Sequence, residues 1–162
     1  MALTKVTGGL LGNLPTGTNN VAVGDTALNS IESGAQYNVA IGSAAGTALT
    51  TGDFNVAVGY AALDATTTGS RNVGVGQNAL GSDTLGSRST AVGQGALGSQ
   101  NFTSSTDAYN VAVGTLAGNA VTTGIRNTLI GALAGDALTD TDNNVAIGYS
   151  ALGSDTLGIN SI

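Results

Sequence analysis

The sequence predicts an all-β protein, a parallel β-solenoid of about eight repeats of 17 residues. A motif of the form Asn-Val-Ala-Val-Gly recurs along the chain, mostly at intervals of 17 residues, and a fixed period indicates stacked units that contact mainly their neighbours. Each copy alternates β-branched with small residues, as in a strand. Glycine supplies 26 of 162 residues and aromatic residues only 4%, so a core of large side chains is excluded.

Two parts of unequal size are expected along the chain. Residues 1–18 hold the only proline and the only lysine and lie outside the repeat, so we interpret them as an N-terminal arm, either a frayed end or a segment that docks on a partner. Residues 19–162 form the solenoid domain. A sustained 3.6-residue period is missing, which argues against helices.

Within each motif, two β-branched columns lie two residues apart and therefore point to one face of a strand. We predict that this face is the structural core. The small residue between them, such as Ala57, would let a second layer approach the opposite face closely. The predicted core residues are Val21, Val23, Val39, Ile41, Val56, Val58, Val73, Val75, Val92, Val111, Val113, Ile130, Val145 and Ile147.

A glycine ends every motif, and alanine follows three residues later in all copies. The glycine predicts a corner with unusual backbone dihedrals or close backbone approach, and the Ala-Leu or Ala-Gly pair predicts a second short segment folded against the strand. The corner residues are Gly24, Gly42, Gly59, Gly76, Gly93, Gly114, Gly131 and Gly148.

The asparagine that opens each motif, replaced only at Ser89, predicts either a ladder of stacked side-chain amides or a residue that satisfies a turn. The residue before it forms another column, in which Phe54 would lie beside Arg71 and Tyr109 beside Arg126. Such cation–π pairs could brace the coils or present a binding strip. Candidate partner-binding residues in this column are Tyr37, Phe54, Arg71, Tyr109 and Arg126.

The period breaks once, between Gly93 and Gly114, where residues 98–109 run four residues longer than in other repeats. An insertion on one turn of a solenoid usually forms a surface loop, and loops often carry function. Phe102 in this loop is therefore another candidate contact residue.

Composition excludes several kinds of chemistry. Cysteine and histidine are absent, which removes disulfides, thiolate nucleophiles, imidazole bases and the usual transition-metal ligands. A net charge of −6 with four basic residues disfavours nucleic acid. The Gly-x-Gly-x-x-Gly pattern at Gly93–Gly98 follows from the repeat, and Asp136, Asp140 and Asp142 are interpreted as solvated turn residues. We expect no catalytic, cofactor or metal site and no enzyme activity.

The sequence predicts only one clear strand per 17 residues, and one strand per coil can enclose only part of a core. This favours several identical chains that wind together, and three is the natural number for a fibre. A single chain that closes its own core is the alternative. No apolar run approaches the roughly 20 residues that span a bilayer, so no membrane insertion is expected.

The Asn-Val-Ala-Val-Gly and Asn-Val-Ala-Ile-Gly units, with Ala-Leu or Ala-Gly following, resemble the head repeats of trimeric autotransporter adhesins. Similar repeats are found in bacteriophage tail-fibre and virion appendage proteins, and Met-Ala-Leu-Thr-Lys-Val resembles the start of many phage tail proteins. The resemblance implies a left-handed β-roll made by three chains, with the Val and Ile columns turned into each roll. It covers Asn20 to Leu152, but the repeat here is longer than that of the adhesins.

The expected function is that of a structural virion protein, a tail fibre, spike or capsid appendage that forms a rigid trimeric rod. The alternative is a receptor-binding or adhesion module that contacts a host through the 98–109 loop or the aromatic and arginine column. Expected partners are two further copies of the chain, other virion proteins bound through residues 1–18 or the C-terminal end, and a host-surface receptor. The expected location is the virion, assembled in the host cytoplasm, with the bacterial cell surface as the alternative.

Overall fold

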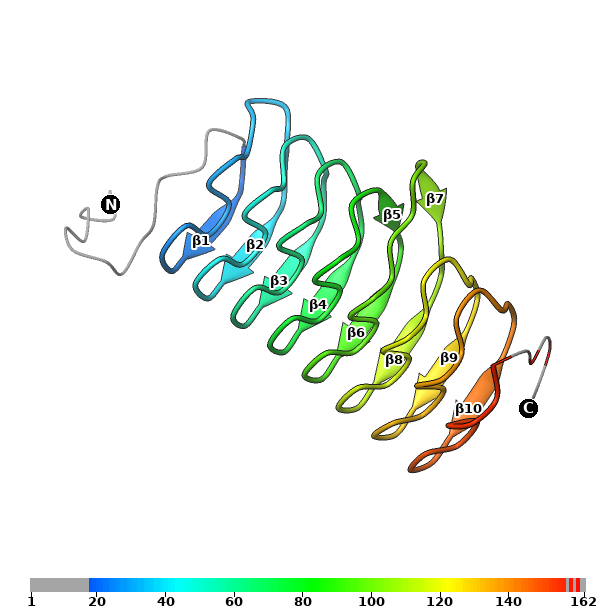
Figure 1. Ribbon diagram of the computed structural model, residues 1–162. Helices are drawn as coiled ribbons and strands as arrows, with labels where there is room; N and C mark the ends of the chain where they lie inside the picture. The colour runs from blue at the N-terminus through cyan, green and yellow to red at the C-terminus, as the bar shows by residue number, and fades with distance from the viewer. Residues whose placement is uncertain (1–17, 157, 159, 161–162) are drawn as a thin grey trace.

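The computed structural model describes residues 18–156, 158 and 160, and shows a row of parallel coils (Figure 1). The predicted arm, residues 1–18, lies outside the described residues except for Thr18. Eight three-residue strands form one parallel sheet, and a second sheet has two strands. The large sheet contains β1 (Val21–Val23), β2 (Val39–Ile41), β3 (Val56–Val58), β4 (Val73–Val75), β6 (Thr90–Val92), β8 (Val111–Val113), β9 (Thr128–Ile130) and β10 (Val145–Ile147). The small one pairs β5 (Gly86–Ser87) with β7 (Thr106–Asp107).

The strands stack in register, so each motif residue lies beside its equivalent in the next coil. Val56 pairs with Val39 on one side and Val73 on the other. Backbone hydrogen bonds continue through the turns, where the amide of Leu63 donates to the carbonyl of Ala79 at 3.0 Å. The parallel β-solenoid with a spacing of about 17 residues is thereby confirmed.

The core lies on the face of the sheet opposite to the predicted one. Each strand turns its central residue inward, a small residue in all strands but β9. There it meets the alanine three residues after the corner glycine and, in five of the eight coils, the leucine that follows. Ala57, Ala62 and Leu63, for example, are all buried. None of the fourteen Val and Ile residues predicted as core is buried within the chain, and Ile147, Val21 and Ile41 are 67%, 46% and 42% exposed.

The interior is narrow at the central strand positions. In β4 the central residue is Gly74, and a Cβ there would already lie 3.1 Å from the side chain of Leu63 and 3.1 Å from the carbonyl oxygen of Ala79. The prediction of the core failed because it took the bulkier face as the buried one, whereas close approach of two layers selects alanine.

Packing is complementary from coil to coil. Leu129 is the one large residue at a central strand position, and its methyl groups occupy the space left by Gly118 and Gly135, where a Cβ would lie 2.6 and 2.7 Å from them. Val121 lies three residues after Gly118, and Leu138 lies three residues after Gly135. Both side chains are buried in the core. A single chain therefore encloses this core.

The corner glycines behave as predicted. Gly42 has φ = +134°, and a Cβ there would lie 2.5 Å from the carbonyl oxygen of Gly59 in the next coil. Because that obstacle is backbone, no side-chain rotation relieves it. All eight corners have φ between +124° and +138°, and the close approach to backbone recurs at all of them except Gly148, where nothing lies within 4 Å. The described residues include no helix long and apolar enough to cross a membrane.

Candidate binding surfaces

The outward faces of the eight strands form a continuous apolar surface, which we call the valine strip: the fourteen Val and Ile residues above with Thr90 and Thr128. Its members are half-buried or exposed, because in-register stacking covers only their flanks. The strands that carry these residues form one continuous row in Figure 1. A contiguous exposed apolar surface of this kind indicates an interaction site.

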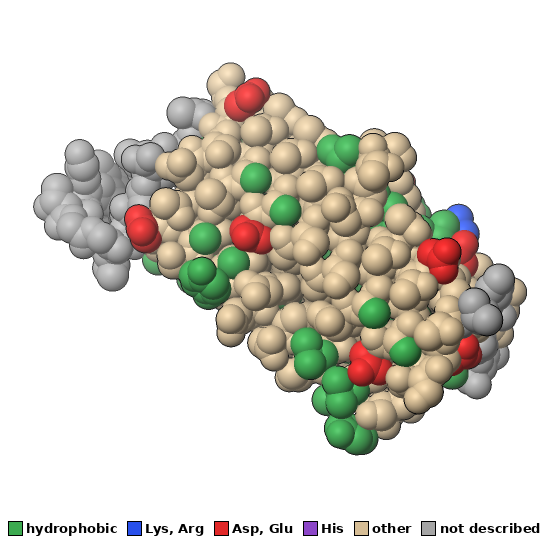
Figure 2. Space-filling model, in the orientation of Figure 1, with side chains coloured by type: hydrophobic (Ala, Val, Ile, Leu, Met, Phe, Trp, Pro, Cys, Tyr) green, Lys and Arg blue, Asp and Glu red, His purple; other side chains and the backbone are tan. Residues whose placement is uncertain are grey.

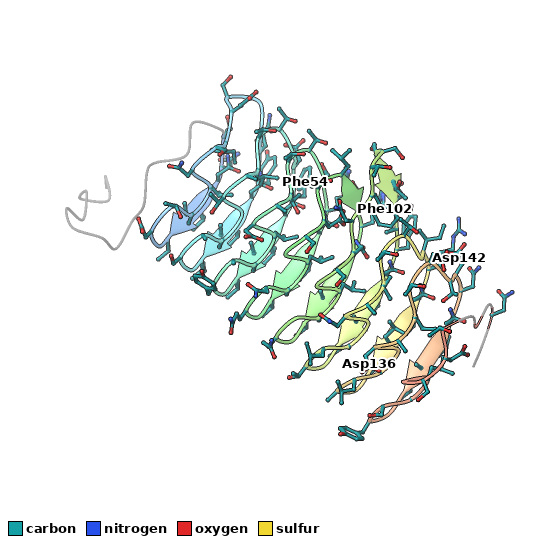
Figure 3. The ribbon with its side chains drawn as sticks, viewed as in Figure 1. Phe54, Phe102, Asp136 and Asp142 are labelled. Atoms are coloured by element: carbon teal, nitrogen blue, oxygen red, sulfur yellow. The ribbon has the colours of Figure 1, made fainter. Side chains whose placement is uncertain are left out.

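Next to the strip, at the amino end of the strands, lies the aromatic–arginine column: Tyr37, Phe54, Arg71, Arg88, Tyr109 and Arg126. Figure 3 shows Phe54 at this end of β3. The rings of Tyr37 and Phe54 stack with centroids 5.0 Å apart and planes inclined by 11°. The guanidinium of Arg71 lies 5.3 Å from the centroid of Phe54, as the column predicted.

The second predicted cation–π pair has a different partner. The guanidinium over Tyr109, at 5.7 Å, belongs to Arg88 rather than to Arg126. Asp107 explains the choice, because its carboxylate accepts a 3.0 Å ion pair from Nε of Arg88 and so draws this side chain toward the coil of Tyr109. Both side chains of the ion pair are substantially exposed, so the pair adds little stability.

All six column residues have a left-handed backbone, with φ between +53° and +65°. Asparagine tolerates this conformation well and occupies the same position at Asn19, Asn143 and Asn160. Aromatic and arginine residues tolerate it less, and a cation–π contact at an exposed site offsets this backbone strain by only about 0.5–1 kcal/mol. Local stability therefore does not explain why the middle coils carry these side chains.

The asparagine column forms a ladder, and the same side chains also bond to the turns, so both predicted roles are observed. The backbone amide of Asn55 donates to Oδ1 of Asn38 at 2.9 Å, and its Nδ2 donates to the carbonyl of Gly69 at 2.9 Å. The same pair of contacts recurs at Asn38, Asn72 and Asn127. These amides are buried, and the ladder satisfies backbone groups that the narrow core would otherwise leave unpaired.

At Ser89 the ladder lacks an amide, and Gln100 supplies one. Nε2 of Gln100 donates to Oγ of Ser89 at 3.1 Å and to Oδ2 of Asp83 at 2.5 Å, while its Oε1 accepts from Nδ2 of Asn110 at 2.8 Å. Gln100 and Asp83 are buried. Sequence reasoning missed both, although a Ser in the Asn column beside a longer repeat was a usable signal.

The inserted segment is anchored rather than free. Phe102 is 5% exposed, so it is not the exposed contact residue that we predicted. Its amide faces Oδ1 of Asp83 at 3.4 Å, and its carbonyl accepts from the hydroxyl of Thr84 at 3.1 Å. These contacts, and the pairing of β7 with β5, hold the segment against the preceding coil, and the tip at residues 103–105 remains exposed.

Burial raises the pKa of Asp83 above its ordinary value of 3.8, because desolvation of the carboxylate outweighs hydrogen bonds from Gln100 and from the amides of Gly86, Phe102 and Leu85. Burial likewise raises the pKa of Asp64, because desolvation outweighs the opposing effect of hydrogen bonds from the backbone amides of Asp64 and Ala65. Asp64 borders a polar hollow of about 370 Å³, floored by Gly81, Gly95 and Gly98. One carboxylate among amides and hydroxyls does not form an acid–base pair.

Asp136 and Asp142 lie apart in Figure 3. Asp136 is not the solvated turn residue that was predicted, because its Oδ1 is buried and has no hydrogen-bond partner among the described residues. Oδ1 of Asp142 accepts from the amide of Ile125 at 2.8 Å. Among the described residues, no group of three or more acidic side chains is placed to hold a metal ion.

No protein-family model, curated protein or solved structure matches this chain.

Proposed function

We propose that this chain is a structural virion protein, in which three copies pack into a rigid rod that serves as a tail fibre, spike or capsid appendage. The valine strip carries this proposal. An apolar surface that extends along every coil is costly for an isolated chain in water, and burial against equivalent strips of two further copies removes that cost.

The geometry of the coils suits a mechanical role. Each coil is hydrogen-bonded to the next through strands, turns and the asparagine ladder, and eight coils at a strand spacing of about 4.8 Å give a rod of roughly 40 Å. The resemblance to adhesin head repeats and phage fibre proteins supports a trimer. Its implication that the Val and Ile columns point into each roll does not hold for this chain, whose roll is filled by alanine and leucine.

The mass of the purified chain in solution, measured by light scattering, tests the trimer. We expect a species of three times 15.6 kDa. The double variant Ile41→Lys/Val113→Lys places charges on exposed positions of the strip and should yield folded monomer with an unchanged far-ultraviolet spectrum. A matched double variant away from the strip, Ser82→Lys/Ser99→Lys, should remain trimeric. A wild-type monomer would overturn the proposal.

An adhesion module is the second candidate function. The aromatic–arginine column favours it, because these side chains are exposed and local stability does not account for them. Loss of host binding in column variants that remain trimeric would support it. The 98–109 loop no longer supports this role through Phe102, which is buried.

A further inference from the structure

Among the described residues of this acidic protein, positively charged side chains lie along one line. The chain has four basic and ten acidic residues. Lys5 lies outside the described residues, and all three arginines belong to the aromatic–arginine column. On the face shown in Figure 2, acidic side chains are scattered and blue is visible only at one edge. Segregation of every described cation on a single edge indicates recognition of negative charge.

Within the column, Arg71 and Arg88 occupy neighbouring coils and lean apart. The guanidinium of Arg71 lies over Phe54 in the preceding coil, and that of Arg88 lies over Tyr109 in the following coil. Like charges on adjacent strands repel, and the ion pair with Asp107 draws Arg88 toward the coil of Tyr109, so the two guanidinium groups diverge. Asp107 neutralises Arg88, whereas neither Arg71 nor Arg126 has an acidic partner among the described residues.

We propose that the column binds an extended acidic polysaccharide, whose carboxylates pair with Arg71 and Arg126 while its sugar rings contact Phe54 and Tyr109. The two arginines are three coils apart, or about 14 Å at a strand spacing of about 4.8 Å, so only an extended chain reaches both. The inference rests on the adhesion candidate above and names its ligand class.

The spacing of the charges favours a polysaccharide over nucleic acid. Protein–DNA contacts commonly engage about 6–10 phosphates with clustered cations, and this chain offers two arginines without acidic partners on a surface of net negative charge. A polymer with sparser carboxylates suffers less repulsion from the surrounding acidic residues. The half-exposed rings of Phe54 and Tyr109 also give an apolar edge that suits sugar rings.

Titration of the full chain with polygalacturonate tests the inference. We expect binding that weakens between 50 and 200 mM salt, and none to the fully methyl-esterified polymer, which has the same backbone without the charges. The variant Arg71→Gln/Arg126→Gln should lose about tenfold in affinity, as expected for two exposed ion pairs. The variant Ser82→Asp/Ser99→Asp is the charge-matched control: it lowers the net charge by the same two units at exposed positions outside the column and should lose much less affinity.

Three results would overturn the inference: absence of binding, equal losses in the double variant and the control, or equal affinity for duplex DNA and polygalacturonate. Light scattering on the same samples keeps this outcome separate from the rod proposal. If the protein is a trimer that does not bind the polymer, only the proposed ligand is wrong. If it is a monomer that binds the polymer, only the proposed trimeric rod is wrong.

Discussion

The regular coils, residues 38–80, and the irregular coil, residues 81–110, solve the same packing problem by different means. In the regular coils the ladder asparagine repeats every 17 residues and the core is alanine and leucine, with a single hydroxyl, that of Thr66. In the irregular coil an ionisable carboxylate and a glutamine are buried in the positions next to Thr66 along the stack. The solenoid therefore accommodates a longer coil here, because the hydrogen bonds of Gln100 with Asp83, Ser89 and Asn110 replace those of the asparagine that is missing at Ser89.

The regular coils depend most on the bare backbone at their corners, and Gly42→Ala should break them. The new Cβ would meet the Gly59 carbonyl at 2.5 Å in a backbone conformation that L-residues rarely adopt. We expect the free energy of unfolding in urea to fall by about 3 kcal/mol or more. Gly34→Ala, with nothing within 4 Å of its Cβ, should change it by less than about 0.5 kcal/mol. Similar losses in both would contradict the corner model.

The irregular coil should be most sensitive at Gln100. Gln100→Leu removes the bond to Oδ2 of Asp83 and one of the two bonds from Nδ2 of Asn110, whose other bond is to the carbonyl of Gly124. These losses should cost about 3 kcal/mol in denaturant unfolding. Thr66→Val, in the same core column of a regular coil, removes one hydrogen bond to the Asp83 carbonyl and should cost about 1 kcal/mol. A larger loss at Thr66 would mean that Gln100 only fills space.

The pH dependence of unfolding should separate the two regions further. Because the folded pKa of Asp83 lies above 3.8, the folded state binds this proton more tightly, and stability rises as the pH falls from the folded pKa toward 3.8. Below 3.8 both states are protonated and the contribution is constant. Asp83→Asn should remove this rise from unfolding curves measured across that window.

Asp64→Asn, in a regular coil, should remove a smaller part of the rise, because Asp64 is less buried and is partly solvated. An unchanged pH profile in Asp83→Asn would mean that water reaches the carboxylate in the folded state.

The smallest effect is expected at the aromatic–arginine column. Phe54→Asn loses the stack on Tyr37 and the cation–π contact with Arg71, each worth about 0.5–1 kcal/mol, but gains a residue that suits a positive φ. We expect a net change within about 1 kcal/mol of zero in urea unfolding. A loss above about 2 kcal/mol would make the column a structural brace and weaken its assignment as a binding surface.

The contacts within regular repeats of the candidate surfaces could be predicted from the sequence, whereas those beside the inserted segment could not. The contact between Phe54 and Arg71 could be predicted from the sequence, because the coils stack in register and residues one repeat apart therefore lie beside each other. The partner of Tyr109 and the burial of Phe102 could not, because the inserted segment breaks the repeat and Asp107 and Asp83 then select the contacts.

By itself, the sequence determined the parallel solenoid, its period and its glycine corners, because each depends on one repeating unit and the backbone freedom of glycine. Only the tertiary structure decided which face of the strands is inside. Alternation permits either choice, but the strand lies so close to the Ala-Leu segment that alanine or glycine fills the inward central position in seven of the eight strands, and Leu129 fits only beside Gly118 and Gly135. This close approach places the valine strip on the surface, where it becomes the feature from which function is inferred.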